Sequence, residues 1–566
     1  MYLDFLVKIP EAKGKLLYEK RGGATYIKYE YDRIYDPRRQ YTLPKRATIG
    51  KLSKTDETMM QPNQNFLKFF PEAELPLYEN RTDRSSCLRI GTYVVIKKII
   101  RDYQLEEILG LYFGEKDLGL FLDLAVYSII SENNAGQYYP VYAYNHPLFT
   151  REMKLYSDST VSDFLHRITS DQSVGFLNEW NESRNHREKI YISYDSTNKN
   201  CQAGDIEMVE FGKPKVDVGA PVFNYAVAYD TNNREPLFYE KYPGSIVDVS
   251  QLRLMLDKVV GYGYKKVGFI LDRGYFSKKN IEYMDSCGYS FVIMVKGMAS
   301  FVNQLVLKHH GSFERKRSCD MDGYGVYGKT VKGRLYETDQ KERYFHIYHS
   351  VTKEAAERTA LEAKLKKMKT YLMQHVNEEI DFGPAFQHYF YMHYDESGKV
   401  FLYPEERLQI TEREIQLCGY FVIVTSGRMT AKEAIHLYKS RDGSEKLFRG
   451  DKSYLGNQSI RVHSDESASA KIFVEFVALI IRSKLYTCLT DEMKKLGKKP
   501  NFMTVPAAVR ELEKIEMVRQ TDNVYRLDHA VTAAQKTILK AFGLSENHIK
   551  YRASEISDIL KNNRKR

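Results

Sequence analysis

The stretch LYKSRDGSEKLFRGDK (437–452) places one acid among a phenol and two cations at helical spacing. Those side chains are Tyr438, Arg441, Glu445 and Lys452. At about 100° per residue, the spacing puts all of them within about 60° of one face of a helix. An acid with such neighbours suits a site that holds a metal ion while the flanking groups bind phosphate. Gly443 costs a helix about 1 kcal/mol relative to Ala, so we expect a kink or a late helix start there.

Upstream of this stretch, short β-type runs alternate with helical patterns. The predicted strands are REKIYISYDSTNKN (187–200), PVFNYAVAYD (221–230), KKVGFILDRGY (265–275), YSFVIMVKG (289–297) and GYFVIVTS (419–426), and the predicted helices are 249–260 and 277–287, the second with Ser277 as N-cap. Strands that alternate with helices predict a mixed α/β core. The first run is expected to end at Asp195 and the third at Asp272, which is where ligand crevices open in α/β sheets.

Asp195, Asp272 and Glu445 are therefore predicted to converge on one crevice. Three carboxylates repel one another unless cations lie between them, and hard oxygen ligands select Mg²⁺ or Mn²⁺. Two such ions about 3.5–4 Å apart can activate a water or a 3′-hydroxyl and stabilise the leaving oxygen of a phosphodiester. The sequence contains no glycine-rich phosphate loop, no H-E-x-x-H and no Rossmann fingerprint that would indicate another chemistry.

Each acid also has a purely structural interpretation. Asp195 before Ser196 can form an Asx-turn. Asp272 can open a turn in which Gly274 supplies a positive φ. Glu445 can be a surface acid on a charged helix. Occurring together, in this order and on these elements, the three acids favour a shared site.

The motifs around these acids carry a resemblance to a known family. Tyr438-x2-Arg441-x3-Glu445-x6-Lys452 matches a Y-R-E-K signature at every spacing, and LDRGYFSKKN (271–280) is similar to a D-R-G-[FY] element with a downstream Asn. Asp272 and Glu445 are 173 positions apart, which leaves room for a β-rich insertion before the last acid. On these motifs the chain resembles the D-D-E transposases of prokaryotic insertion sequences, in the cut-and-paste branch with the Y-R-E-K signature. The likeness covers roughly residues 188–485.

The resemblance implies a ribonuclease-H-like catalytic core in a Mg²⁺-dependent enzyme, with two ions per active site and Mn²⁺ as a substitute. It implies that the catalytic, metal-binding residues are Asp195, Asp272 and Glu445. The residues implied to contact DNA are Tyr438, Arg441 and Lys452, at phosphates near the transferred strand end, and Arg273, at the backbone. Family members cleave the element ends, form and reopen a hairpin, and join the ends to target DNA. They act as homodimers on double-stranded DNA with terminal inverted repeats.

Six segments organise the predicted chain. They are a β-hairpin unit and linker (1–88), a helical DNA-end-binding domain (89–187), the first part of the core (188–297), an insertion domain (298–410), the second part of the core, carrying Glu445 (411–490), and a C-terminal helical region (491–566). Residues 24–52 are predicted to form a hairpin that turns at Asp36-Pro37, and residues 53–88 a loop. The hairpin interleaves tyrosines with basic residues such as Arg38 and Arg39, which suits either a phosphate-binding arm or a solvated hairpin.

The remaining elements follow from apolar periodicity. The helices are 91–103, 105–112, 117–133, 160–168 with Ser159 as N-cap, 353–373 with Thr352 as N-cap, 468–485, 506–519 and 530–541, and hairpin strands are expected at 343–349, 386–394 and 400–403. The helical domain can dock DNA ends or pack without that role, and the lysine-rich face of 353–373 can bind DNA or simply be solvated. The tail KNNRKR (561–566) is basic and expected to fray.

Composition fits a soluble protein with an anionic partner. Lys and Arg number 85 against 74 Asp and Glu, giving a formal net charge of +11, which is compatible with nucleic acid. The six scattered cysteines form no C-x-x-C pair, so we expect neither a zinc site nor a disulfide framework. Residues 1–10 contain charges and do not resemble a signal peptide, and the apolar stretches 118–130 and 472–481 are too short to span a bilayer. We expect a cytoplasmic, nucleoid-associated protein with no membrane partner.

The predicted function is that of a DNA transposase. Two alternatives stay open: a catalytically silent, transposase-derived DNA-binding protein, and a ribonuclease-H-like nuclease without strand transfer. The three intact acids argue against the silent protein. Joining of the product ends to a target DNA distinguishes a transposase from a nuclease.

Overall fold

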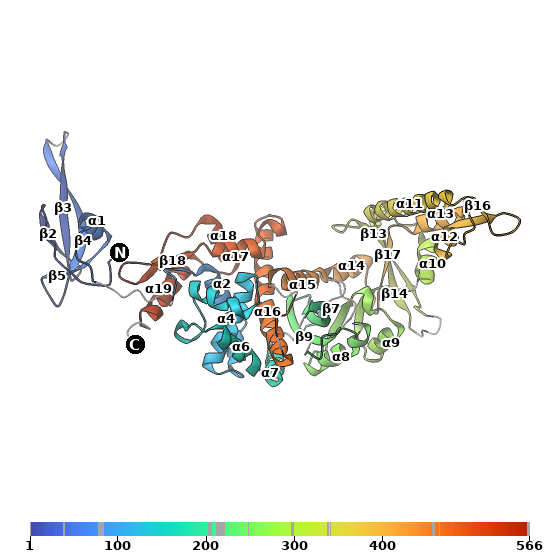
Figure 1. Cartoon of the computed structure of the whole chain (residues 1–566), viewed down its shortest axis with the longest axis horizontal. Coiled ribbons are helices and arrows are strands. Elements are labelled where there is room, and N and C mark those ends of the chain that lie inside the picture. The colour runs from blue at the N-terminus through green and yellow to red at the C-terminus, as the bar shows by residue number, and fades with distance from the viewer. Residues whose placement is uncertain are drawn as a thin grey trace. The chain divides into compact units, whose positions relative to one another are not determined.

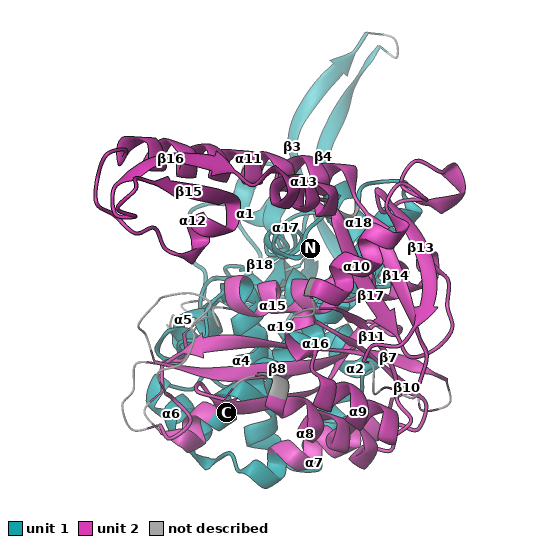
Figure 2. Ribbon diagram, turned by 90° about the vertical axis from the view of Figure 1, so that its right-hand side faces the viewer, with its two compact units in different colours: residues 1–172, 454–456, 469–566 teal, residues 173–453, 457–468 magenta. Residues whose placement is uncertain are grey.

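The computed structural model describes most of the chain as two compact units. Unit 1 comprises residues 1–172, 454–456 and 469–566, and unit 2 comprises residues 173–453 and 457–468 (Figure 2). The described residues are 2–37, 40–76, 84–184, 186, 188–201, 206–210, 221–246, 248–295, 299–336, 339, 341–455, 459–462 and 464–562.

Within the described parts of unit 2, nine strands form one mixed sheet in the order β12-β13-β14-β17-β11-β10-β7-β8-β9. Strands β7, β10 and β11 are parallel, and the other neighbours pair antiparallel. The strands are β7 (Ile190–Asn200), β8 (Val222–Asp230), β9 (Glu235–Pro243), β10 (Val267–Leu271), β11 (Ser290–Met294), β12 (Asp320–Met321), β13 (Val326–Gly333), β14 (Arg343–His349) and β17 (Tyr420–Thr425). The order β9-β8-β7-β10-β11 is the predicted ribonuclease-H-like mixed sheet.

Helices cover both faces of this sheet, which explains its nearly continuous apolar strands. Every residue of β8 and of β10 is buried, as expected for strands packed on two sides. In Figure 1, α8 (Asp248–Gly261) and α9 (Lys278–Ser286) lie below the sheet, and α14 (Ala431–Ser440) and α15 (Asp442–Tyr454) lie above it. The predicted N-cap of α9 is observed, because the Ser277 side chain accepts the Asn280 N–H at 3.2 Å.

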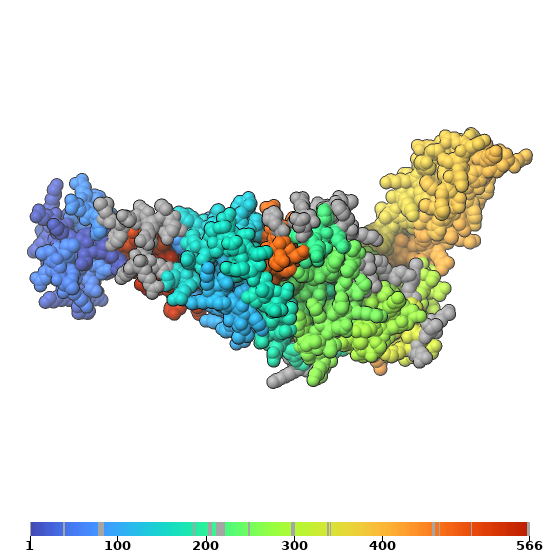
Figure 3. Space-filling model, turned by 60° about the horizontal axis from the view of Figure 1, so that its bottom comes forward, coloured from blue at the N-terminus to red at the C-terminus, as the bar shows by residue number. Residues whose placement is uncertain are grey.

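The segment between β11 and β17 contributes to the sheet and also forms a lobe. Strands β12, β13 and β14 extend the central sheet through β17, so this β-rich insertion continues the core sheet as well as interrupting its sequence. The other elements of the segment are α10 (Ala299–His309), α11 (Val351–Gln374), α12 (Pro384–Tyr389), β15 (Phe390–Tyr394), β16 (Phe401–Glu406) and α13 (Leu408–Leu417). The elements from α11 to α13 enclose their own apolar cluster, centred on Leu372, Phe382 and Phe401, and form the yellow-to-orange lobe of Figure 3.

Unit 1 begins with a sheet that contains the predicted hairpin. Over residues 2–76, five strands lie in the order β1-β5-β4-β3-β2. These elements are β1 (Val7–Lys8), β2 (Leu16–Arg21), β3 (Ala24–Asp36), β4 (Tyr41–Leu52), β5 (Met59–Pro62) and α1 (Gln64–Phe69). The outer ends of β3 and β4 pair with each other as a long ribbon (Figure 2). Arg38 and Arg39 of the predicted basic arm lie outside the described residues.

Helices make up most of the rest of unit 1. They are α2 (Gly91–Asp102), α3 (Leu105–Gly110), α4 (Glu115–Ser131), α5 (Tyr139–Asn145), α6 (Asp158–Arg167), α17 (Val505–Leu512), α18 (Ala533–Ala541) and α19 (Glu546–Asn562), while α7 (Ser170–Glu182) and α16 (Asp465–Lys495) run from one unit into the other. A small sheet in the order β19-β18-β6 joins sequence-distant segments, because Leu88 pairs with Met517. Its strands are β6 (Cys87–Arg89), β18 (Glu516–Arg519) and β19 (Tyr525–Leu527).

Three predicted segments differ from the structure. Residues 53–88 were expected to be a loop, but they contain β5 and α1, because Asn63 caps α1 and Phe66 is fully buried. Residues 506–519 are not one helix, because α17 ends at Leu512 and β18 pairs with β6. The hairpin strand expected at 386–394 begins only at Phe390, after α12. Residues 77–83 and 563–566, which belong to the predicted linker and tail, lie outside the described residues.

Two helix starts differ from the prediction, and several elements, β9 and α19 among them, were not predicted. The N-cap of α6 is Ser157 instead of Ser159, and that of α11 is Ser350 instead of Thr352; each observed serine accepts a backbone N–H three residues on. The apolar stretches 118–130 and 472–481 lie in α4 and α16, as expected, and no helix in the described part of the chain combines the length and apolar character needed to cross a membrane.

Asp123 is a fully buried carboxylate in α4. Its Oδ1 accepts the Phe149 N–H at 2.7 Å, and its Oδ2 accepts the Thr150 N–H at 3.2 Å. Burial raises the pKa of Asp123 to about 7, although these hydrogen bonds and the Arg84 charge oppose the rise. The carboxyl group therefore anchors the chain after α5 to α4 at an electrostatic cost.

We predict that the contribution of Asp123 to the free energy of unfolding falls as the pH rises from about 4 to about 7. The folded state binds the Asp123 proton more tightly than the unfolded state, so its contribution is complete at acidic pH and is lost as the pH passes the folded pKa. The pKa difference corresponds to about 4 kcal/mol. Denaturant unfolding across this range should give a shallower pH dependence for Asp123→Asn than for the wild type. Identical profiles would contradict the assignment.

Candidate active site

The two aspartates lie at adjacent positions of neighbouring parallel strands. Tyr194 of β7 pairs with Leu271 of β10, and the next residue on each chain is Asp195 and Asp272. Neighbouring strands are about 4.8 Å apart, so the register alone brings the two residues together. Asp195 does not end its strand as predicted. It lies in the middle of β7, which continues to Asn200, so the Asx-turn interpretation of Asp195 is wrong.

Asp272 does stand at the end of its strand, as predicted. Its carbonyl oxygen accepts the Tyr275 N–H at 3.0 Å, which closes a 3₁₀ turn over Arg273–Tyr275. Gly274 has no positive φ, so the turn does not need a glycine for its conformation. The strand end leaves the Asp272 side chain about one-third exposed.

Glu445 lies on α15, above the face of the sheet that carries Asp195. The hydroxyl oxygens of Ser193 and Ser444 lie 3.0 Å apart in a buried contact, and Ser193 shares its face of β7 with Asp195. The stretch 437–452 is not one helix, because α14 ends at Ser440 and α15 begins at Asp442. Arg441 occupies the break in a helical conformation, so the helix is interrupted two residues before Gly443 and not at the glycine, which lies inside α15.

Arg441 connects the acids. Its Nη1 lies 3.1 Å from Asp272 Oδ1, and its Nη2 lies 2.5 Å from Glu445 Oε1. Burial alone would lower the pKa of Arg441, but Tyr438 and the three acids raise it, with Asp195 among those acids. The side chain is 14% exposed, whereas that of Glu445 is 50% exposed. Two of the three predicted acids therefore pair directly with one guanidinium, and the charge of the third, Asp195, also acts on it.

The other predicted site residues lie around this cluster to different degrees. Tyr438 is buried in the apolar core under α14, with its ring centroid 5.4 Å from the Arg441 guanidinium carbon. Burial raises the pKa of Tyr438 to about 12, with Asp272 and Glu445 adding to the rise and Arg441 opposing it. Arg273 is exposed beside Asp272, and its charge also acts on Tyr438. Lys452 lies two turns beyond Glu445, about 10 Å along α15.

The donor chemistry of the cluster fits hard divalent cations, since carboxylate oxygens are the ligands that Mg²⁺ and Mn²⁺ prefer. Among the described residues, no three acidic, histidine or cysteine side chains are grouped closely enough to hold an ion. The reason is visible in the ion pairs: oxygens of Asp272 and Glu445 are directed at Arg441. A divalent ion held by these acids would be repelled by the guanidinium charge beside it.

Comparison with known proteins identifies the family. Residues 192–481, which include the three acids, match the family model described as the transposase DDE domain, and the match covers just over half of the chain. The chain belongs to the DDE-domain transposases. Members of this family generally use divalent metal ions. The match confirms the resemblance inferred from the Y-R-E-K and D-R-G-Y motifs.

Other comparisons are more distant. The transposase is similar to a piggyBac transposase whose synaptic complex with hairpin DNA was solved by cryo-electron microscopy. The two share 8% sequence identity with a TM-score of 0.35, over 83% of this chain and 82% of that chain. No curated protein matches the transposase.

A buried ion pair that the sequence analysis missed fixes the far end of α15 to β7. Lys199 Nζ lies 2.8 Å from Asp451 Oδ2, and the two side chains are 0% and 1% exposed. The ammonium group also lies 4.6 Å from the Tyr225 ring centroid. Alternation along β7 offered a signal, because Lys199 falls on the same face as Asp195. No local pattern predicts that Asp451, 252 residues away, is the partner of Lys199.

Gly443 allows α15 to approach the sheet closely. A Cβ atom at this position would lie 2.9 Å from the Tyr229 ring of β8, and Tyr229 is 3% exposed and enclosed by the core. Together with the Ser193–Ser444 contact and the Lys199–Asp451 pair, this contact sets the height and register of α15 over β7. Gly443 therefore lowers the helix propensity of α15 but allows the helix to pack closely on β8.

We predict that Lys199→Met or Asp451→Leu alone destabilises the transposase by about 3–5 kcal/mol, because each removes one half of a buried ion pair. The double variant should recover most of this loss, since an apolar pair needs no charge compensation. Chemical denaturation of the four proteins measures the coupling free energy. A double variant that loses the sum of the two single losses would show that the charges do not compensate each other.

We predict that Gly443→Ala destabilises the transposase by about 1–3 kcal/mol through overpacking against Tyr229, although Ala is the better helix former. Gly261, the last residue of α8, is the matched control, because a Cβ atom there meets nothing within 4 Å. Gly261→Ala should be neutral or stabilising in the same denaturation experiment. A stabilising Gly443→Ala would mean that helix propensity outweighs the close contact.

Proposed function

We propose that this transposase cleaves the ends of a DNA element and joins them to target DNA by two-metal-ion phosphodiester chemistry. The observation that supports this proposal most directly is the convergence of Asp195, Asp272 and Glu445 on one cation at the edge of a ribonuclease-H-like sheet. Mutual repulsion between three carboxylates from separate elements opposes folding. Such a cluster is therefore better explained by a functional site than by a contribution to stability.

In this proposal the three acids hold the metal ions, with Mg²⁺ as the physiological ion and Mn²⁺ as a substitute. When bound, two ions supply an activated water or 3′-hydroxyl and charge stabilisation at the leaving oxygen. Asp195 and Asp272 contribute ligands from fixed positions on paired strands. Glu445 contributes from α15, where its exposure leaves the side chain able to reorient.

Cationic and phenolic groups complete the proposed site on the DNA side. Arg441 can pair with a phosphate in a bidentate manner, and its charge is permanent. The neutral phenol of Tyr438 can donate a hydrogen bond to a phosphate oxygen. Lys452, farther along α15, and Arg273, exposed beside Asp272, are suited to contact backbone phosphates on either side of the scissile position.

The proposed reaction is cut-and-paste transposition with a hairpin intermediate, carried out by a homodimer on double-stranded DNA with terminal inverted repeats and on target DNA. The helical segment 89–187 is proposed to bind the element ends, within the six-segment organisation given by the sequence. Such a protein acts at the nucleoid, in the cytoplasm of a prokaryotic cell.

One rival has support in the geometry. The ion pairs of Arg441 would also suit a DNA-binding transposase derivative in which the guanidinium permanently neutralises the acids. Cleavage separates the two functions, because only a working transposase produces cut ends.

We predict that the purified transposase cuts DNA carrying its own element ends in the presence of Mg²⁺, and that Asp195→Asn, Asp272→Asn and Glu445→Gln each reduce cutting by at least roughly 10³-fold through the loss of a metal ligand. Asp442→Asn is the matched control, since it removes an exposed acid from the same turn of α15 and should keep activity. Joining of the cut ends to a plasmid distinguishes a transposase from a nuclease. DNA binding without cutting at any Mg²⁺ or Mn²⁺ concentration would establish the silent derivative.

A further inference from the structure

Arg441 engages the oxygens that a divalent ion would need. One guanidinium nitrogen pairs with Asp272 and another with Glu445, while the charge of Asp195 acts on the same group. The guanidinium pairs with Asp272 Oδ1 and Glu445 Oε1, and a divalent ion bound by the same carboxylates at about 2.0–2.6 Å would lie beside its positive charge, which repels the ion. The guanidinium and the ion are therefore competitors for one set of ligands.

The competition cannot be relieved by a change of protonation. Arginine stays charged at any physiological pH, so Arg441 can only move away from the acids and not become neutral among them. Beside divalent cations, its charge is repelled and requires an anion elsewhere. A DNA phosphate is the anion that the proposed reaction brings to this place, and the guanidinium fork matches its oxygens.

The surroundings confine the movement to the side chain. Before Arg441, α14 is held by a capping box at Thr430 and Glu433 and by the buried Tyr438. After it, α15 is fixed to β7 through Ser444 and through Asp451. The backbone on both sides is anchored, so Glu445 keeps its place over the sheet while the guanidinium turns.

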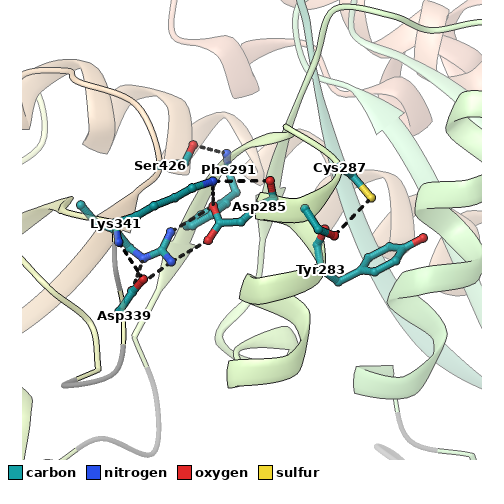
Figure 4. Close-up of polar contacts among 9 residues, drawn as sticks. Tyr283, Asp285, Cys287, Phe291, Asp339, Lys341 and Ser426 are labelled. Carbon is teal, nitrogen blue, oxygen red and sulfur yellow. Dashed lines mark hydrogen bonds and ion pairs between the residues drawn. The ribbon is translucent and has the colours of Figure 1, made fainter.

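A second arginine–acid cluster in unit 2, around Arg343, is an example of a buried, purely structural ion-pair cluster. Arg343 Nη2 lies 2.6 Å from Asp285 Oδ2 and 3.0 Å from Asp339 Oδ2. Figure 4 shows Asp285, Asp339 and Lys341 gathered at this contact between α9 and the start of β14. The Arg343 side chain is 3% exposed, and the side chains of Asp285 and Asp339 are 17% and 11% exposed. The side chains of Asp272 and Glu445 are more exposed, at 36% and 50%. Of these two clusters among the described residues, the Arg441 cluster is the one that an incoming ion and phosphate can reach.

We propose that Arg441 is an internal counter-ion that exchanges places with divalent metal, leaving the acids for a DNA phosphate as the ions enter. Metal binding and DNA binding are then coupled, because each removes an obstacle to the other. This inference rests on the proposed function, in which Asp195, Asp272 and Glu445 form the metal site. It assigns Arg441 a role as counter-ion of the acids before the reaction begins, in addition to the proposed contact with phosphate.

The test is Mn²⁺ binding, measured by the electron paramagnetic resonance signal of free Mn²⁺ and by calorimetry, on the full chain with and without a short DNA duplex. Without DNA, Arg441→Gln should bind Mn²⁺ about ten-fold more tightly than the wild type, because the competing charge is gone. Arg441→Lys keeps the charge and should remain near the wild type. Duplex DNA should raise the Mn²⁺ affinity of the wild type several-fold and that of Arg441→Gln much less.

The outcomes separate the two proposals. Equal or weaker Mn²⁺ binding by Arg441→Gln, with binding still abolished by Asp195→Asn and Asp272→Asn, would overturn the exchange and leave the metal site intact. Mn²⁺ binding that is insensitive to those aspartate variants would remove the metal site, and the exchange with it. Thermal unfolding checks folding: Mn²⁺ should raise the Tm of Arg441→Gln more than that of the wild type, since only the variant lacks its own counter-ion.

Discussion

The parallel pairing of β7 with β10 is the contact on which the candidate site depends. With Tyr194 opposite Leu271, Asp195 and Asp272 become lateral neighbours, and a slip of one residue would direct one of them to the other face of the sheet. The register is held by the core, since β10 is buried along its whole length and β8 flanks β7 on its other side. The acids themselves contribute repulsion, which the apolar strands around them must outweigh.

Two cations compensate the charge around these strands in different ways. Lys199 is enclosed with Asp451 and serves as a fixed link between β7 and α15. Arg441 lies at a partly open edge, among acids that solvent can reach. Burial therefore distinguishes a structural ion pair from one that can be replaced by another cation.

Much of this arrangement followed from local sequence patterns. Apolar runs and strand ends located β8, β10 and β17, and the spacing of Tyr438, Arg441 and Glu445 located the helical end of the site. Asp195 was placed on the right strand, but Ser196-Thr197-Asn198 suggested a turn where pairing with β8 keeps the chain extended. Contacts between segments that are distant in the sequence produce no periodic pattern of residues. Three features depend on neighbours that are distant in the sequence, so no local pattern predicts them. They are the Lys199–Asp451 pair, the extension of the sheet by β12–β14 and the packing of Gly443 on Tyr229.

The insertion also sets an order of assembly. Glu445 follows β17 in the sequence, so the last acid is made only after the whole segment between β11 and β17. At roughly 5–20 residues per second, the 173 positions from Asp272 to Glu445 take about 9–35 s to synthesise. Arg441 leaves the ribosome together with Glu445. A nascent chain in which β7 and β10 had already paired would hold its two aspartates side by side without the guanidinium that later balances them.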